Sequence, residues 1–172
     1  MRSLALCLLV AATPLRAGDG GVSHCAVPGF RGVLVAGAGL YVGAEQDQEQ
    51  LHKLRTLGVK LVIDLRPDEG DAGMPEARLA ASAGLDYRRV VVRGAEDLTS
   101  ERARALEAAI KTAKGEPVLV HCSTGNRAAA LLALRDALVR GQSREASLSF
   151  MRRSGLIKLE SAVSAELDRQ HR

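Results

Sequence analysis

The chain has 172 residues, of which 47% are hydrophobic and 26% are charged, and its formal net charge is +4. This length and composition indicate a single globular domain and exclude an intrinsically disordered protein. The chain has no Trp, two Tyr and two Phe, so few rings can stack on bases, and we expect no nucleic-acid partner. Its four His are scattered and no Cys-x-x-Cys pair is present. We therefore expect no metal and no cofactor.

The N-terminal segment has the pattern of a secretory signal peptide. Arg2 precedes an apolar run over residues 4–12, and Ala17 supplies a small residue for cleavage. The run is too short to span a bilayer. We therefore expect residues 1–17 to be a signal peptide. The mature protein would be periplasmic or secreted, without stable insertion in a membrane.

Cleavage after Ala17 would leave residues 18–32 as a leader or loop and residues 33–172 as one folded domain. It would also remove Arg2 and Arg16, which lowers the net charge from +4 to +2. Such a mild balance does not attract nucleic acid or a membrane surface strongly.

Two thiols, Cys25 and Cys122, would remain after cleavage removes Cys7. In an oxidising compartment these two can form one disulfide. Alternatively, Cys122 stays reduced for chemistry and Cys25 has no part in it. The sequence leaves both possibilities open, and it does not indicate an oligomeric state.

Apolar runs and helical patterns alternate along the chain. Short apolar runs predict strands over residues 33–35, 40–42, 59–65, 87–92 and 117–120. Strands that alternate with helices predict an α/β fold with a parallel or mostly parallel sheet flanked by helices, in a single domain. Six helices are predicted. The first follows a cap at Asp47 and stops at Gly58, the second runs from Pro75 to Gly84, and the third begins with a cap at Thr99 or Ser100. The other three span residues 128–139 and lie near residues 144–152 and 159–170.

The loop between the last strand and the helix at residues 128–139 has the pattern of an anion-binding site. A helix N-terminus exposes unpaired N–H groups and the positive end of its dipole. Gly125 lets the backbone curl so that several N–H groups converge on one anion, and Arg127 adds a two-donor fork for an oxyanion. Cys122 lies at the base of this predicted cradle, where the same groups stabilise a nucleophilic thiolate. We do not assign His121 as a base.

The pattern VLVHCxxGxR at Val118–Arg127 resembles the signature loop of the protein tyrosine and dual-specificity phosphatase superfamily. Three earlier segments, Leu40–Gly43, Gly58–Asp68 and Gly84–Tyr87, are similar in order to an atypical bacterial branch, the phosphatase-like proteins of the beta-lactamase-hydrolase-like type. The resemblance covers about residues 30–140 of the sequence.

This resemblance implies a Cys-dependent phosphatase that hydrolyses phosphotyrosine or other phosphomonoesters, on a protein or a small molecule, through a thiophosphoryl enzyme intermediate. Cys122 would be the nucleophile and Arg127 would hold the oxyanion. The substrate-binding loop would consist of Ser123, Thr124, Gly125 and Asn126.

The loop departs from the phosphatase pattern at two points. Four residues separate Cys122 from Arg127, where the phosphatase superfamily has five, and the shorter loop resembles that of rhodanese-type sulfurtransferases. Ala128 stands where the superfamily usually has a Ser or Thr that assists release of the thiolate. Ser123 or Thr124 would have to replace that hydroxyl, and slow turnover is expected.

Phosphoester cleavage also needs an acid that protonates the leaving oxygen. In phosphatases of this type the acid is an Asp in the loop after the preceding strand, and Asp97 lies in such a loop 25 residues before Cys122. Glu96 and Asp68 are the alternatives. We expect Asp64 to be buried in its strand.

Arg66 has two possible roles, a contact with the oxyanion or a salt bridge at the sheet edge, of which we favour the second. Two other functions remain open for the chain as a whole. One is a rhodanese-like sulfurtransferase or persulfide-handling protein that uses Cys122. The other is a non-catalytic domain that binds an anion or a partner.

Overall fold

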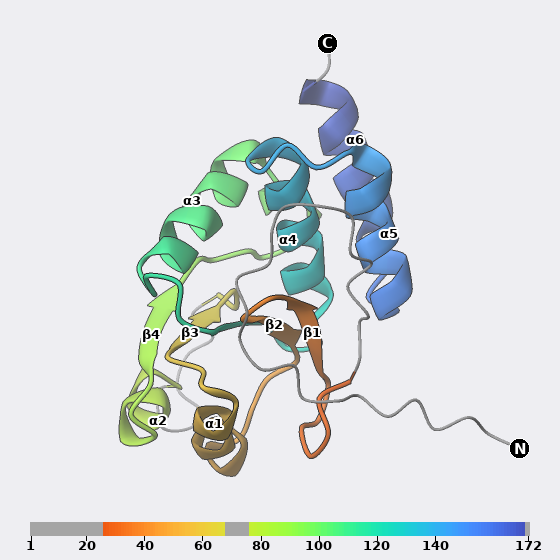
Figure 1. Cartoon of the computed structure of the whole chain (residues 1–172). Coiled ribbons are helices and arrows are strands. Elements are labelled where there is room, and N and C mark those ends of the chain that lie inside the picture. The colour runs from red at the N-terminus through yellow and green to blue at the C-terminus, as the bar shows by residue number, and fades with distance from the viewer. Residues whose placement is uncertain (1–25, 68–75, 171–172) are drawn as a thin grey trace, which may run out of the picture.

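A computed structural model describes residues 26–67 and 76–170 (Figure 1). These residues contain one five-stranded sheet with the strand order β1-β2-β5-β3-β4. β1 and β2 are antiparallel, whereas the other three pairings are parallel. The predicted α/β fold with a mostly parallel sheet is therefore confirmed. The strands are β1 (Val33–Gly37), β2 (Leu40–Gly43), β3 (Leu61–Asp64), β4 (Asp86–Arg89) and β5 (Val118–His121).

Helices cover both faces of the sheet (Figure 1). Successive residues of β3 point to opposite faces, so that Leu61 and Ile63 join one apolar core and Val62 joins the other. Helices α3 to α6 cover the first core and α1 and α2 cover the second. The helices are α1 (Gln48–Leu54), α2 (Glu76–Ser82), α3 (Ser100–Lys111), α4 (Asn126–Leu138), α5 (Arg144–Ser154) and α6 (Glu160–Gln170), with short 3-10 turns η1 (Arg55–Leu57) and η2 (Ala95–Asp97).

The predicted helix caps agree with the structure. Asp47 Oδ1 accepts a hydrogen bond from Gln50 N at 2.8 Å, and Thr99 rather than Ser100 caps α3 by accepting from Arg102 N. The strand predicted over residues 87–92 is shorter, because regular pairing ends at Arg89. The predicted signal peptide, Cys25, Asp68 and Pro75 lie outside the described residues.

Helix α4 is the central helix of the larger core. Its eight residues from Ala128 to Arg135 are all buried, and it packs against α3, α5 and α6. A helix that is apolar around most of its circumference is surrounded by other elements. This packing fixes the position of the helix N-terminus, which follows the loop after β5.

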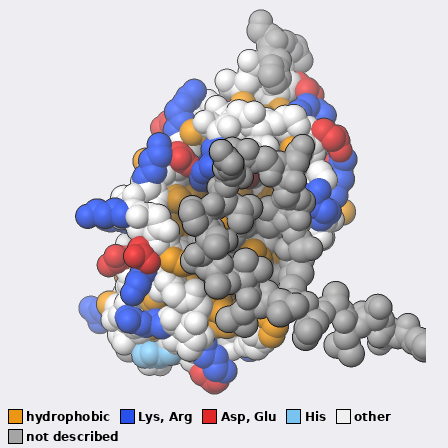
Figure 2. Space-filling view, viewed as in Figure 1, with side chains coloured by type: hydrophobic (Ala, Val, Ile, Leu, Met, Phe, Trp, Pro, Cys, Tyr) orange, Lys and Arg blue, Asp and Glu red, His pale blue; other side chains and the backbone are white. Residues whose placement is uncertain are grey.

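The described surface carries both charge signs. On the face in Figure 2, Lys and Arg side chains lie around the periphery and are interspersed with Asp and Glu. Within residues 26–67 and 76–170, no helix has the length and apolar character needed to cross a bilayer.

The polar side chains buried near the carboxyl edge of the sheet include Asp64, Glu76 and His121. Burial lowers the pKa of His121 from 6.5 to about 4, because an imidazolium loses its hydration there. The negative charge of Asp64 opposes this shift and the positive charge of Arg66 adds to it. His121 is therefore neutral in the folded protein at neutral pH.

We expect the free energy of unfolding to decrease as the pH falls from about 6.5 to about 4. Over this range His121 takes up a proton in the unfolded chain but not in the folded one. His121→Gln removes this difference, so its slope of stability against pH should be smaller by up to about 1.4 kcal/mol per pH unit.

Chemical denaturation at about pH 7, 5.5 and 4.5 measures both slopes. The control is His52→Gln, because the side chain of His52 is exposed on α1. Equal slopes for the wild type and His121→Gln would contradict the prediction.

Candidate active site

The candidate site lies where β5 passes into α4. β5 ends at His121, and the four residues Cys122–Gly125 form the turn that leads into the helix. Gly125 N donates a hydrogen bond to Cys122 Sγ at 3.2 Å. Gly125 has a φ of 86°, and an added Cβ would lie 3.2 Å from Leu156 Cδ1. Both the left-handed backbone and the close neighbour favour glycine here.

The first turn of α4 directs N–H groups toward this loop. Gly125 is the N-cap and supplies no side-chain acceptor. Ala129 N is the first group to reach a carbonyl within the helix, bonding Gly125 O at 2.9 Å. The N–H groups of Asn126, Arg127 and Ala128 precede it and have no partner within the helix, which is the usual basis for anion binding at a helix start.

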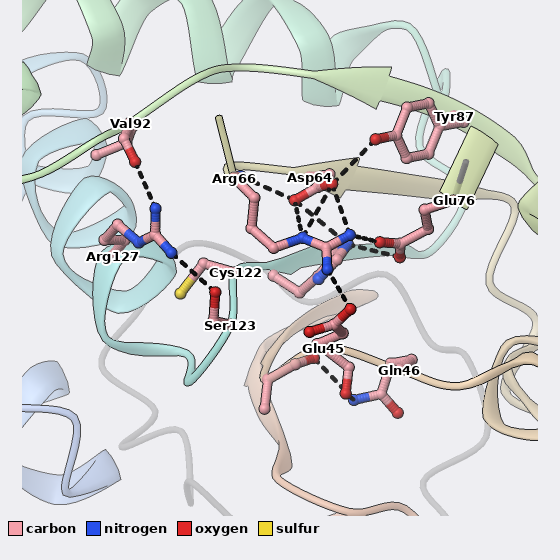
Figure 3. A network of polar contacts seen from close by, with 12 residues as sticks. Glu45, Gln46, Asp64, Arg66, Glu76, Tyr87, Val92, Cys122, Ser123 and Arg127 are labelled. Atoms are coloured by element: carbon pink, nitrogen blue, oxygen red, sulfur yellow. Dashed lines mark hydrogen bonds and ion pairs between the residues drawn. The ribbon is translucent and has the colours of Figure 1, made fainter. Parts of the chain in front are cut away.

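Arg127 joins the loop to the segment that follows β4. Its Nη1 donates to Val92 O at 2.8 Å, and its Nη2 donates to Ser123 Oγ at 3.0 Å. Figure 3 shows the guanidinium beside Cys122, held between these two acceptors. The structure thus brings Cys122, Ser123, Gly125 and Arg127 together.

Thr124 and Asn126 make contacts that hold the loop. Asn126 Nδ2 donates to Thr124 Oγ1 at 3.2 Å, and Asn126 Oδ1 accepts from Lys158 N at 3.2 Å. Lys158 belongs to the turn between α5 and α6, as does Leu156 beside Gly125. Substrate binding by Thr124 and Asn126 stays a prediction.

The segment after β2 also contacts the cysteine loop through its backbone. Cys122 N donates to Gly43 O at 3.3 Å, and Glu45 N donates to Ser123 O at 3.5 Å. Ala44 and Thr124 form an isolated antiparallel bridge between these contacts. The residue types of this segment do not indicate a contact with a loop 79 residues further along the chain, so its role could not be predicted from the sequence.

The predicted acid, Asp97, lies in η2. Its Oδ2 accepts from Arg93 N at 2.8 Å and lies 3.5 Å from Arg93 Nη1. The same segment supplies Val92 O to Arg127, so the loop that carries Asp97 is beside the site while its carboxylate faces Arg93. Glu96 is exposed on the same turn. The identity of the acid stays a prediction.

A network of charged residues lies on the other side of Cys122 from Arg127 (Figure 3). Arg66 Nε and Nη2 each lie 3.0 Å from an oxygen of Asp64, and Tyr87 Oη donates to Asp64 Oδ2 at 3.0 Å. Arg66 also pairs with Glu45 and Glu76. Asp64 is fully buried in β3. The preferred interpretation of Arg66 as a salt-bridging residue is confirmed.

Glu76 was missed by the sequence analysis and lies beside two residues of this network. Its Oε1 lies 3.0 Å from His121 Nε2, and its Oε2 pairs with Arg66. Asp64, Glu76 and His121 could each offer an atom to a metal ion. However, the guanidinium of Arg66 already bonds both carboxylates, so its positive charge takes the place of a cation. The ring of His121 is fully buried and is not available as a base for a substrate.

A separate cavity of about 570 Å³ lies at the opposite edge of the sheet. Its lining includes Val118, the first residue of β5, whereas Cys122 follows the last. Glu107, Arg135 and Asp136 line it as well. This cavity is therefore distinct from the cysteine loop.

Comparison with known sequences places the chain in one family. The family model of the "Beta-lactamase hydrolase-like protein, phosphatase-like domain" matches residues 21–139. Two proteins named beta-lactamase hydrolase-like protein, from Xylella fastidiosa strains Temecula1 and 9a5c, are 33% identical over 103 residues. The match covers 58% of this chain and 23% of theirs, so the chain spans less than a quarter of these curated relatives.

Solved structures share the fold. A DUF442 protein of Shewanella putrefaciens CN-32 has a TM-score of 0.60 and 26% identity, with 80% of this chain and 92% of that chain covered. TpbA of Pseudomonas aeruginosa, solved in complex with phosphotyrosine, has a TM-score of 0.58 and 21% identity, with coverage of 77% and 80%. These solved structures share the fold of the chain, and the chain belongs to the family of the phosphatase-like domain of beta-lactamase hydrolase-like proteins.

Proposed function

We propose that this chain is a Cys-dependent phosphatase that hydrolyses phosphomonoesters, with phosphotyrosine as one candidate substrate. One observation carries the proposal. Cys122 Sγ lies at the base of a loop, the N-terminus of α4 faces this loop without a side-chain cap, and Arg127 lies in the first turn of that helix. The family and the fold shared with the phosphotyrosine complex of TpbA support it.

In the proposed reaction the thiolate of Cys122 attacks phosphorus, an S–P bond forms, and the P–O bond to the leaving group breaks. The leaving oxygen takes a proton from an acid, for which Asp97 is the first candidate. Arg127 and the first N–H groups of α4 stabilise the negative charge on the phosphoryl oxygens. Water then cleaves the S–P bond and releases phosphate. Since Arg127 is held by Val92 O and Ser123 Oγ, little side-chain ordering is needed when the anion arrives.

The second step is expected to be slow. Ala128 has no hydroxyl with which to assist departure of the thiolate, and its side chain is buried in α4. Ser123 is the better replacement of the two loop hydroxyls, because it already contacts Arg127 while the hydroxyl of Thr124 bonds Asn126.

A second candidate function is sulfur transfer through a persulfide on Cys122. Two observations favour it: the four-residue spacing between Cys122 and Arg127, and the carboxylate of Asp97 facing Arg93. In that reaction the thiolate takes a sulfur atom from thiosulfate and releases sulfite, and cyanide then takes the sulfur as thiocyanate. No acid for an ester oxygen is required.

The signal peptide at residues 1–17 and the periplasmic or secreted location remain predictions for either function.

Cys122→Ser should lower turnover of p-nitrophenyl phosphate by at least about a thousandfold, because an alcohol is not ionised in the loop at neutral pH. The measurement is steady-state hydrolysis by reduced protein. Cys25→Ser is the matched control and should keep wild-type activity. A Cys122→Ser protein with wild-type turnover would rule out the proposed mechanism.

Asp97→Asn should lower kcat/KM for phenyl phosphate by about a hundredfold, because kcat/KM reports the first step and the phenol leaving group needs a proton there. The loss should be much smaller for p-nitrophenyl phosphate, whose leaving group is a weaker base. Glu96→Gln, on the same turn, should behave as wild type on both substrates. Equal losses on both substrates would show that Asp97 is not the acid, and Asp68→Asn would be compared in the same way.

The two candidate functions predict opposite results in a paired assay. A phosphatase should hydrolyse p-nitrophenyl phosphate and form no thiocyanate from thiosulfate and cyanide. The assay is run on reduced wild type and on Cys122→Ser, so that any turnover is assigned to the thiol. Cys122-dependent thiocyanate formation without phosphate release would replace the phosphatase proposal with sulfur transfer.

A further inference from the structure

The Gly43–Glu45 segment continues the pairing between β2 and β5 beyond the end of the sheet. Within the sheet, Gly43 pairs with His121. Past the strand ends, Gly43 O accepts from Cys122 N, and Glu45 N donates to Ser123 O. The segment therefore lies along the cysteine loop, and its position limits where the backbone of Cys122 and Ser123 can lie.

The side chain of Glu45 connects this segment to Arg66. Glu45 is 57% exposed, whereas Arg66 is 19% exposed and bonded to the fully buried Asp64. An exposed ion pair alone contributes little. This one differs because the guanidinium is already held in place on its other side, so Glu45 pairs with a fixed partner.

The three nitrogen atoms of the Arg66 guanidinium contact carboxylates from three parts of the chain, and Nη2 contacts two of them (Figure 3). Its Nε and Nη2 bond Asp64 at the end of β3, Nη2 also pairs with Glu76 of α2, and Nη1 pairs with Glu45. Only a planar, multi-donor group can connect three carboxylates in this way, and a lysine ammonium cannot reproduce that geometry. Arg66 thus connects β3, α2 and the Gly43–Glu45 segment.

Arg66 does not itself contact the loop that receives the anion. Its neighbour Leu65 donates through N to His121 O at 2.9 Å, and His121 immediately precedes Cys122. In Figure 3 the Arg66 network and Arg127 lie on opposite sides of Cys122. Any effect of Arg66 on the site must therefore pass through the residues that it holds.

We propose that Arg66 is a positioning residue: through Glu45 it holds the Gly43–Glu45 segment against the cysteine loop and so fixes the shape in which that loop binds an oxyanion. This inference rests on the proposed function only in taking the loop to be an oxyanion site. It applies equally to phosphoryl and to sulfur transfer. The oxyanion would meet the N–H groups of α4 and Arg127, while Arg66 and Glu45 act from behind the loop.

The test measures how inorganic phosphate protects Cys122 from alkylation by iodoacetamide, followed by mass spectrometry of the peptide that contains Cys122. The variants are Glu45→Gln, Arg66→Lys and the double substitution. The matched control is Glu49→Gln, which removes an exposed Glu–Lys pair on α1 whose atoms are 2.5 Å apart. Thermal melting of each variant monitors folding.

We expect Glu45→Gln to raise the phosphate concentration for half-protection about tenfold, with little change in Tm because Glu45 is exposed. Arg66→Lys should raise it at least as much. The double variant should need no more phosphate for half-protection than Arg66→Lys does, because the two substitutions break the same connection between Arg66 and Glu45. Glu49→Gln should match the wild type.

Three results would overturn the inference: wild-type protection in Glu45→Gln, effects of the two substitutions that add independently, or failure of phosphate to protect wild-type Cys122. If Arg66→Lys does not fold, Glu45→Gln still decides the question. Turnover of p-nitrophenyl phosphate is measured alongside. Absence of turnover with the expected shift in protection would reject the phosphatase proposal alone, and normal turnover with no shift would reject the inference alone.

Discussion

The packing of α4 determines where every other part of the site can be. This helix is buried from Ala128 to Arg135 and lies against α3, α5 and α6. Close-packed interiors allow little displacement, so the N-terminus of α4 has one place relative to the end of β5. Four residues have to bridge that short distance, and Gly125 makes the bridge possible through its left-handed backbone. The cysteine loop is therefore shaped by the core beneath it as much as by its own sequence.

The sequence allowed correct prediction of features that depend on neighbouring residues. Asp47 and Thr99 cap helices through atoms only three residues away. Apolar runs such as residues 117–120 were recognisable as strands, because burial on both faces requires continuous apolar residues. The segment from β5 through Cys122 to Arg127 was recognisable because its strand, turn and helix start are adjacent in the chain.

The parts that could not be predicted depend on contacts between distant segments. Glu45 and Glu76 were not singled out, because each is an ordinary acidic residue until the fold brings it to Arg66. The length of β4 was overestimated, since the apolar pattern continues to Val92 while regular pairing ends at Arg89. Beyond that point, Val90 N and Val92 N still donate to Asp64 O and Leu65 O, while Val92 O accepts from Arg127. The residues after the strand therefore join the end of β3 to the site.

Residues outside the family match also contact the cysteine loop. The family model ends at residue 139, before α5 and α6 begin. Yet Leu156 lies against Gly125, and Lys158 N donates to the side chain of Asn126. The turn between the last two helices therefore contacts the loop from a region outside the family match. Sequence divergence in the C-terminal helices can alter the cysteine loop even between relatives whose loop residues are identical.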